Sequence, residues 1–331
     1  MRIAIVGCTG LVGVEVLKVI KELKLKVSEI IPIASEKSAG KDIVFNEKTY
    51  KIVGIQQGLA QKPDIAIFSA GGNISKQWAP EFAKTGCYVV DNSSAWRMDP
   101  NIKLIVPEIN GNLLTPNDKI IANPNCSTIQ LVMVLAPLHR KFVAKRVVVS
   151  TYQAVTGTGQ KAVDQLYKER AGDNHEKVYP HAIDLNCLPH CDSFTENGYT
   201  KEELKLVNEI PKILGEKKMN ITATAVRIPV VSGHSESINI EFKIPFKTKE
   251  VRDILEVTKG VVVVDNPARN EYPMPVNAKN KNEVFVGRIR RDYSLENGIN
   301  LWVVADNLRK GAATNAVQIV KLLVEKKIIS S

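Results

Sequence analysis

The first 125 residues alternate between short continuous hydrophobic runs and stretches of helical periodicity. The continuous runs fall at residues 2–6, 28–34, 63–72, 88–92 and 120–122. Residues 11–23 and 74–85 place hydrophobic side chains three and four positions apart. Continuous runs are typical of strands buried on both faces of a parallel sheet, and the alternation with helices predicts βαβ units. We therefore expect an α/β fold of the Rossmann type in this part of the chain.

The pattern changes after a long apolar stretch at residues 129–136, which is expected to be a buried helix. Hydrophobic and polar residues then alternate, which is typical of strands with one face exposed. The expected strands are residues 145–155, 221–230, 237–244, 261–264, 284–290 and 299–305. Helices are expected near residues 160–170 and at 203–214, the latter interrupted by Pro211. This half should be an α+β domain with a mostly antiparallel sheet.

A last helix at residues 308–326 has small and hydrophobic residues on one face and should return to the first domain. The predicted domains are therefore residues 1–125 plus 307–331, and residues 126–306. A chain of 331 residues exceeds the usual size of one core, which agrees with two domains.

Composition narrows the possible classes. The chain is 44% hydrophobic and 24% charged, lacks the roughly 20-residue apolar stretch of a membrane span, and has no signal-peptide layout. Five scattered cysteines predict a reducing, cytoplasmic location. Cys187 and Cys191 flank His190, but no second ligand pair follows, so no metal is expected. The net charge of +10 is dispersed, which disfavours nucleic acid and suits a small anionic substrate.

Three glycines lie in the turn between the first strand and the first helix, Gly7-Cys-Thr-Gly-Leu-Val-Gly13. The spacing differs from the common dinucleotide fingerprint, and a purely structural turn is the alternative. Its place directly after a strand and before a helix favours pyrophosphate binding at the helix N-terminus.

The end of the second strand indicates which dinucleotide binds. An NAD site usually has an acidic residue there for the ribose hydroxyl. Here Ser35, Lys37 and Ser38 could hold a 2′-phosphate, although Glu36 lies among them. The sequence therefore favours NADP, and residues 69–72, which end the next strand, should line the same cleft.

Cys126 follows Asn125, a good helix N-cap residue, and so should occupy the first helical position. The free N–H groups and the helix dipole favour a thiolate there, which is the nucleophilic form. A small buried hydrophobe is the alternative.

Further candidates follow in the second half. His234 suits acid/base chemistry near neutral pH, and Arg227 could bind a carboxylate with two parallel hydrogen bonds. Glu209 and Lys212 supply a carboxylate and an ammonium on one helical turn, and Arg97 lies in a loop after a strand.

Six blocks together resemble one family. They are residues 7–13, 35–41, Asn123-Pro-Asn-Cys-Ser-Thr128, Ser150-Thr-Tyr-Gln-Ala-Val155, residues 227–235, and Asp306-Asn-Leu-Arg-Lys-Gly-Ala-Ala312. In this order they resemble the bacterial aspartate-semialdehyde dehydrogenases over essentially the whole chain. A related reductase of N-acetylglutamyl phosphate shares the Cys/His logic but has a His-Pro-Gly-Cys type of block, which is absent here.

The resemblance implies roles for individual residues. Cys126 would be the nucleophile, His234 the acid/base and Gln153 the residue that orients the acyl intermediate. Arg227 would bind the substrate carboxylate, Glu209 its amino group, and Arg97, Asn125 and Lys212 its phosphate. The cofactor contacts would be Gly7, Thr9, Gly10, Leu11, Val12, Gly13, Ser35, Lys37, Ser38, Ser69, Ala70, Gly71, Gly72, Ser93, Gly157 and Asn307. Lys37 replaces a frequent arginine and Thr156 a usual serine.

The implied reaction is the NADPH-dependent reductive dephosphorylation of L-aspartyl 4-phosphate to L-aspartate 4-semialdehyde through a thioester, in amino-acid biosynthesis. The resemblance also implies that residues 126–306 are the catalytic and dimerisation domain, through which the chain forms a homodimer or homotetramer. Two alternatives remain: reduction of another acyl phosphate, and a non-catalytic NADP-binding redox sensor that uses Cys126.

Overall fold

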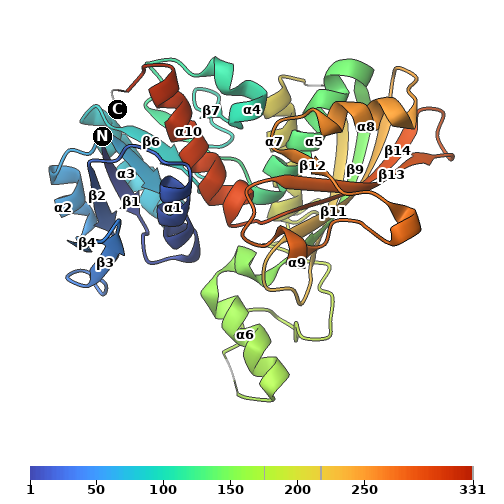
Figure 1. The fold of residues 1–331 in the computed structure, drawn as a ribbon. Coiled ribbons are helices and arrows are strands. Elements are labelled where there is room, and N and C mark those ends of the chain that lie inside the picture. Colours follow the sequence, from blue (N-terminus) through green and yellow to red (C-terminus); the bar gives the residue numbers. More distant parts are fainter. Residues whose placement is uncertain (175, 217, 330–331) are drawn as a thin grey trace. The chain divides into compact units, whose positions relative to one another are not determined.

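The computed structural model describes residues 1–174, 176–216 and 218–329 and divides into two units (Figure 1). The first unit contains Met1–Asn125 and Ala312–Ser331, and the second contains Cys126–Gly311. The last two residues of the predicted first domain, 330 and 331, lie outside the described residues. Within the described part of the chain, no helix combines the length and apolarity needed to cross a membrane.

The first unit is built on a six-stranded parallel sheet with the order β2-β1-β5-β6-β8-β7. Its strands are β1 (Arg2–Val6), β2 (Glu29–Ile33), β5 (Ile65–Phe68), β6 (Tyr88–Asp91), β7 (Lys103–Leu104) and β8 (Ile120–Ala122). The strands β1, β2, β5 and β6 are almost fully buried, which explains their continuous hydrophobic sequences. The expected Rossmann-type α/β fold is confirmed.

Helices cover both faces of this sheet. They are α1 (Leu11–Glu22), α2 (Ile55–Ala60), α3 (Gly72–Lys84), α4 (Pro107–Asn110) and α10 (Thr314–Glu325). One core cluster joins α1 and α10 to one face, and a second joins α3 to the other. The C-terminal helix α10 therefore shares a hydrophobic core with α1 and this sheet.

A small hairpin of β3 (Asp42–Phe45) and β4 (Lys48–Lys51) was not predicted. Its turn residues Asn46 and Glu47 both have positive φ, 48° and 65°. A two-residue turn of this kind usually has glycine at one position, so the residues at this turn did not indicate a hairpin.

The second unit has a mixed six-stranded sheet with the order β10-β9-β11-β14-β13-β12. Its strands are β9 (Ala144–Gln153), β10 (Asn220–Arg227), β11 (His234–Phe242), β12 (Val261–Val263), β13 (Val284–Asp292) and β14 (Gly298–Ala305). The three central pairings are antiparallel, whereas β10 and β12 pair in parallel at the two edges. The mostly antiparallel sheet is thus confirmed.

The helices of this unit are α5 (Cys126–Phe142), α6 (Gln160–Ala171), α7 (Lys201–Leu214), α8 (Thr248–Glu256) and α9 (Pro275–Ala278). α5 is almost entirely buried and packs on β9, β11 and β14. The predicted interruption at Pro211 is wrong, because α7 continues through it to Leu214. A Thr200–Glu203 capping box and buried Leu206, Ile210 and Ile213 hold the helix in place.

The chain returns to the first unit after Gly311 rather than at residue 307. Asn307 belongs to the second unit: its Nδ2 donates to Thr156 Oγ1 at 3.0 Å, and its Oδ1 accepts the N–H of Gly233 at 3.1 Å. A short π-helix, Arg309–Ala313, follows immediately.

Candidate active site

The glycine loop of the first unit is folded so tightly that side chains cannot enter it. Gly7 has a φ of +89°, and a β-carbon there would lie 2.4 Å from the carbonyl oxygen of Ser69. A β-carbon at Gly13 would lie 2.3 Å from the carbonyl oxygen of Gly7. Gly10 is the N-cap of α1. The loop therefore exposes backbone at the start of a helix, as pyrophosphate binding requires.

The turn after β2 offers groups for a 2′-phosphate. The N–H of Ser38 donates to the carbonyl of Ser35 at 2.8 Å, and Ser35 and Lys37 are exposed. The Glu36 carboxylate lies beside Gly54, where a β-carbon would come within 2.5 Å of its Oε1. Ser35, Glu36 and Lys37 are all exposed, so the hydroxyl and the lysine lie in the same exposed turn as this carboxylate.

Arg97 is buried and held by the backbone at two strand ends of the first unit. Its Nε donates to the carbonyl of Asn123 at 2.9 Å, and its Nη2 donates to the carbonyl of Asn92 at 2.8 Å. Only 7% of the residue is exposed. Ser93, two residues after β6, donates its hydroxyl to Asp91 Oδ2 at 2.6 Å.

Cys126 opens α5, as predicted, and its side chain is partly exposed. Gly311 packs directly against it: a β-carbon on Gly311 would lie 2.8 Å from the Cys126 Cβ. A residue larger than glycine at position 311 would crowd the Cys126 side chain. The position of Gly311 in a π-helix next to Cys126 could not be predicted from the sequence.

Gln153, the last residue of β9, is fixed in one orientation. Its Nε2 donates to Ser127 Oγ and to Glu202 Oε1, both at 3.1 Å. An ionised carboxylate can only accept, so the amide nitrogen faces Glu202 and the carbonyl oxygen faces the other way. Gln153 thus presents an acceptor on the side away from Glu202.

His234 is fully buried at the start of β11, and its tautomer is set by the backbone. The N–H of Ala154 donates to its Nδ1 at 3.0 Å. In the neutral ring the proton is therefore on Nε2, which has no hydrogen-bond partner among the described residues. Burial, and then Arg227, lowers the pKa of His234 to about 3. The neutral ring is a hydrogen-bond donor.

Arg227 is held by the same residue. Its Nη1 donates to the carbonyl of Ala154 at 2.7 Å, and it is 5% exposed. Gly157 faces this pair: a β-carbon there would lie 2.9 Å from Arg227 Nη1 and 3.2 Å from His234 Cε1. Ala154 therefore orients both side chains through its backbone, which no residue pattern could reveal.

The carboxylate beside Gln153 belongs to Glu202, not to the predicted Glu209. Lys205 Nζ contacts Glu202 Oε2 at 2.8 Å, so the acid–ammonium pair on this face of α7 is Glu202–Lys205. Glu209 and Lys212 lie two turns further along the helix, about 10 Å away. The sequence alone could not show which pair lies nearer to Gln153, because both pairs lie on the same face of the helix.

The second unit thus gathers Gln153, Arg227 and His234, with the first turn of α5 touching Gln153 through Ser127. The predicted cofactor residues divide between the units. Gly157 and Asn307 lie in the second and all the others in the first. Asn307 uses its amide within the second unit, so its cofactor contact stays a prediction.

His190, which was considered as a metal ligand, makes an aromatic contact. The His190 ring stacks on Phe194 with centroids 4.6 Å apart. Across the described residues, no three His, Cys, Asp or Glu side chains gather as a metal site would require.

Family models match both units. Residues 2–115 match the NAD-binding domain of semialdehyde dehydrogenases, and residues 135–310 match their dimerisation domain. Together with the glycine loop and the Cys126 helix, these matches define a dinucleotide-dependent oxidoreductase.

Individual relatives narrow the class. The aspartate-semialdehyde dehydrogenase of Aquifex aeolicus (strain VF5) is 52% identical, with 99% of each chain covered. That of Bacillus subtilis (strain 168) is 42% identical with the same coverage. A crystal structure of aspartate semialdehyde dehydrogenase II from Vibrio cholerae, complexed with ASA, is 43% identical with a TM-score of 0.94, covering 98% of each chain. This chain belongs to the aspartate-semialdehyde dehydrogenase family.

Proposed function

We propose that the protein reduces L-aspartyl 4-phosphate to L-aspartate 4-semialdehyde and releases phosphate, with NADPH as the reductant. The observation that carries the proposal is the joint orientation of Gln153, Arg227 and His234 in the unit that Cys126 opens. The V. cholerae relative complexed with ASA supports the choice of substrate.

In the proposed reaction the Cys126 sulfur attacks the acyl carbon, and the bond to phosphate breaks. A thioester forms on the enzyme. NADPH, when bound, supplies the hydride that reduces this thioester. The tetrahedral species then collapses, the C–S bond breaks and the aldehyde leaves. The Nε2–H of His234 donates to the former carbonyl oxygen of the substrate, which becomes negative in the tetrahedral species. The carbonyl oxygen of Gln153 accepts hydrogen bonds from N–H or O–H groups of the intermediate.

The substrate head group is proposed to bind Arg227 and Glu202. Arg227 is buried, and its Nε has no hydrogen-bond partner among the described residues, which suits a carboxylate. Glu202 replaces the predicted Glu209 as the acceptor for the amino group, because its carboxylate already contacts Gln153.

Lys205 replaces Lys212 as the proposed lysine for phosphate, together with Arg97 and Asn125. Burial opposes the charge of Lys205, but Glu202 and Asp192 raise its pKa overall, so it remains an ammonium. Its salt bridges are 2.8 Å to Glu202 and 3.0 Å to Asp192.

This assignment separates matched variants. Glu202→Gln should raise the KM for aspartate semialdehyde about tenfold or more, because a charged hydrogen bond to the substrate amine is lost. Glu209→Gln is the matched control on the same helix face and should change KM less than threefold. The reverse order would restore Glu209 to the substrate site.

NADP is proposed over NAD because Ser35, Lys37 and Ser38 offer hydroxyls and a cation. The Glu36 carboxylate, which would oppose a 2′-phosphate, lies against Gly54. The measurement is the ratio of kcat/KM for NADP and NAD, which should exceed 1.

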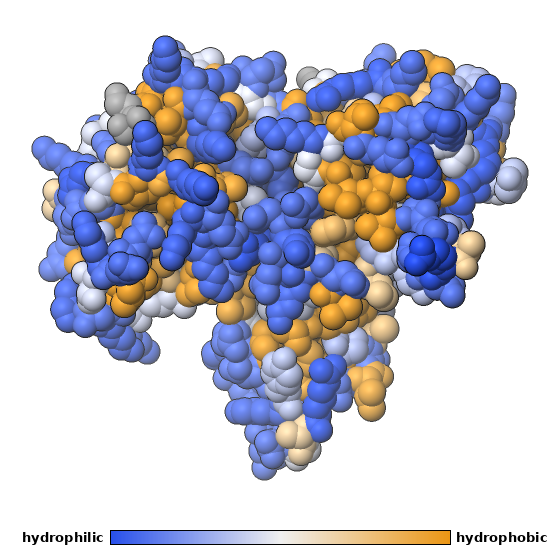
Figure 2. Space-filling model, viewed as in Figure 1, coloured by the Kyte–Doolittle hydropathy of each residue, from blue (hydrophilic) through white to orange (hydrophobic). Residues whose placement is uncertain are grey.

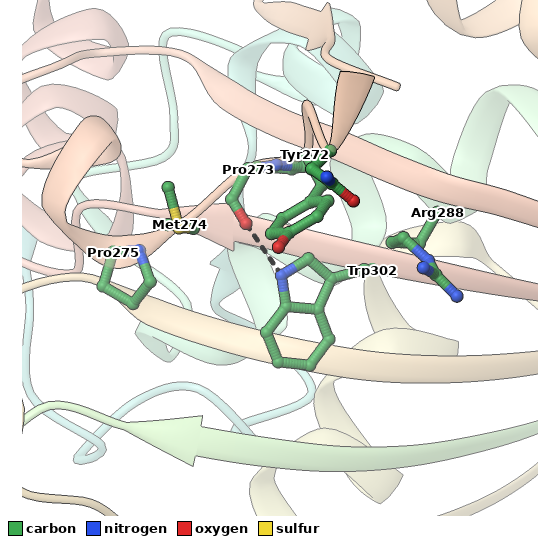
Figure 3. A pocket seen from close by; sticks show the side chains of 7 residues that line it. Tyr272, Pro273, Met274, Pro275, Arg288 and Trp302 are labelled. Carbon is green, nitrogen blue, oxygen red and sulfur yellow. Dashed lines mark hydrogen bonds between the residues drawn. The ribbon is translucent and has the colours of Figure 1, made fainter. Parts of the chain in front are cut away.

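A homodimer is proposed through the outer face of the second sheet. Tyr152 and Trp302 lie half-buried there, with ring centroids 5.4 Å apart. Figure 2 shows hydrophobic residues gathered on this unit over β12 and β13. A shallow pocket of about 400 Å³ lies beside Trp302, whose Nε1 donates to the carbonyl of Pro273 (Figure 3). Sedimentation would distinguish a dimer from the tetramer that the sequence left open.

All five cysteines are free thiols, which supports a reducing location such as the cytoplasm. The partners that we propose are a small anionic substrate and a second copy of the chain. Nucleic acid and membrane are not among them.

The decisive assay is phosphate-dependent reduction of NADP with L-aspartate semialdehyde, run beside the semialdehyde of N-acetylglutamate. Turnover with the first compound alone supports the proposal. Preference for the second would indicate the related acyl-phosphate reductase. Turnover of neither, with intact NADP binding, would favour the redox-sensor alternative.

A further inference from the structure

A buried carboxyl group lies directly behind the site in the second unit and belongs to none of the roles above. Glu236 is two residues after His234 on β11, and both residues are 0% exposed. Alternate residues of a strand share one face, so Glu236 lies beneath His234. Neither carboxyl oxygen has a well-formed hydrogen bond among the described residues. A group like this needs an explanation, because buried polar atoms are rarely left unpaired.

Two further buried polar residues repeat this arrangement. Thr151 is two residues before Gln153 on β9, and the sheet register places it opposite Glu236. Gln130 is four residues after Cys126 on α5, on the same helix face and one turn deeper. We call Gln130, Thr151 and Glu236 the buried polar layer.

The buried polar layer contacts the residues above it. Gln153 Nε2 approaches Thr151 Oγ1 at 3.3 Å. The Gln130 amide lies near the Glu236 carboxyl, and its Nε2, like both Glu236 carboxyl oxygens, has no well-formed hydrogen bond among the described residues. Gln130 and Thr151 are 1% and 0% exposed. Each member is therefore one structural repeat below a residue assigned to the reaction.

We propose that Glu236 is a positioning residue which, through Gln130, fixes the first turn of α5 and hence the place of Cys126 relative to Gln153 and His234. This proposal rests on the proposed function only for its readout in turnover. Glu236 touches no reacting atom and transfers no proton.

The protonation state of Glu236 agrees with this role. Burial raises the pKa of its carboxyl well above the ordinary value, and the nearby Gln130 amide only partly opposes this. A neutral carboxylic acid has one donor and one acceptor, as does the facing edge of an amide. Glu236 and Gln130 can therefore pair in both directions, which a carboxylate, an acceptor only, could not do.

The test compares Glu236→Gln, Glu236→Leu and the double variant Glu236→Leu/Gln130→Leu. Glutamine keeps two-way pairing and should retain kcat within about threefold. Leucine should lower kcat about tenfold or more at a nearly unchanged KM, because small misplacements of reacting groups are costly. The double variant removes both polar partners and should recover thermal stability without recovering kcat.

A purely structural role would give a different result, with kcat and stability recovering together in the double variant. Wild-type kcat in Glu236→Leu would also overturn the proposal. So would equal losses in the glutamine and leucine variants, because that would require an ionisable acid.

A second readout needs no substrate. The rate of Cys126 alkylation by iodoacetamide, followed by peptide mass, should change at least threefold in Glu236→Leu and little in Glu236→Gln. An unchanged rate in the leucine variant would count against the positioning role. If the wild-type protein failed to turn over aspartate semialdehyde, the proposed function would fail, while this comparison would still decide the role of Glu236.

Discussion

Replacing His234 with glutamine should preserve much more activity than replacing it with leucine. The Ala154 N–H occupies Nδ1, so His234 presents Nε2–H as a donor. A glutamine amide can offer an N–H in a similar place, whereas leucine offers none. The comparison tests whether Nε2 of His234 carries a proton, because a general base would need a free lone pair on that nitrogen.

The size of the effect follows from the charge that develops in the reaction. Removing one donor to an oxyanion lowers kcat by about 10²–10³, or roughly 2.7–4 kcal/mol. We expect that loss for His234→Leu. His234→Gln should lose only about tenfold, because its donor is present but less rigidly placed.

The assay is kcat and kcat/KM between pH 5 and 8 for both variants and the wild type. Because the pKa of His234 is lowered to about 3, its protonation should produce no inflection in this range. His190→Gln is the matched control, because His190 stacks on Phe194 outside the Gln153–Arg227–His234 group.

Stability gives an independent check on the same proton. The folded-state pKa of His234 is below the ordinary 6.5, so the unfolded chain binds the proton more readily. Its contribution to stability is therefore present above pH 6.5 and is lost as the pH falls toward 3, by about 1.4 kcal/mol per unit. Denaturant unfolding of the wild type should show this loss at pH 5, and His234→Gln should show less of it.

The reasoning would be refuted if His234→Gln were as inactive as His234→Leu while the wild type showed an inflection near pH 6.5 that both variants lacked. That combination would identify His234 as a titrating acid/base.

Two glycine substitutions test the geometry of each unit. Gly157→Ala places a β-carbon against Arg227 and His234 and should lower kcat/KM about tenfold, as steady-state kinetics would show; an unchanged value would mean that the pair can move aside. Gly7→Ala meets the carbonyl of Ser69 at a φ of +89° and should destabilise the fold by about 2 kcal/mol and weaken NADP binding, measured by thermal unfolding and titration. Wild-type stability and affinity in that variant would contradict the tight loop.

The fold was largely predictable because buried parallel strands leave a continuous hydrophobic run. β5 and the part of β1 that follows Arg2 are covered on both faces, so these positions are all apolar. The start of α5 was also predictable, since Asn125 precedes a long apolar stretch. The β3–β4 hairpin was not, because its turn lacks the expected glycine.

The site was predictable only in part, for two physical reasons. Glu202 and Glu209 share one face of α7, so spacing alone could not choose between them, whereas the contact with Gln153 does. Ala154 acts through its N–H and carbonyl, which every residue except proline carries. Roles of that kind appear only when the backbone is placed.

The account depends most on a thioester at Cys126. The most direct measurement is rapid mixing of the enzyme with L-aspartate semialdehyde and NADP without phosphate, followed by NADPH absorbance. A burst of about one NADPH per active site, absent in Cys126→Ala and followed by turnover once phosphate is added, is the predicted result. A burst in Cys126→Ala, or no burst in a wild-type enzyme that turns over with phosphate, would contradict the account.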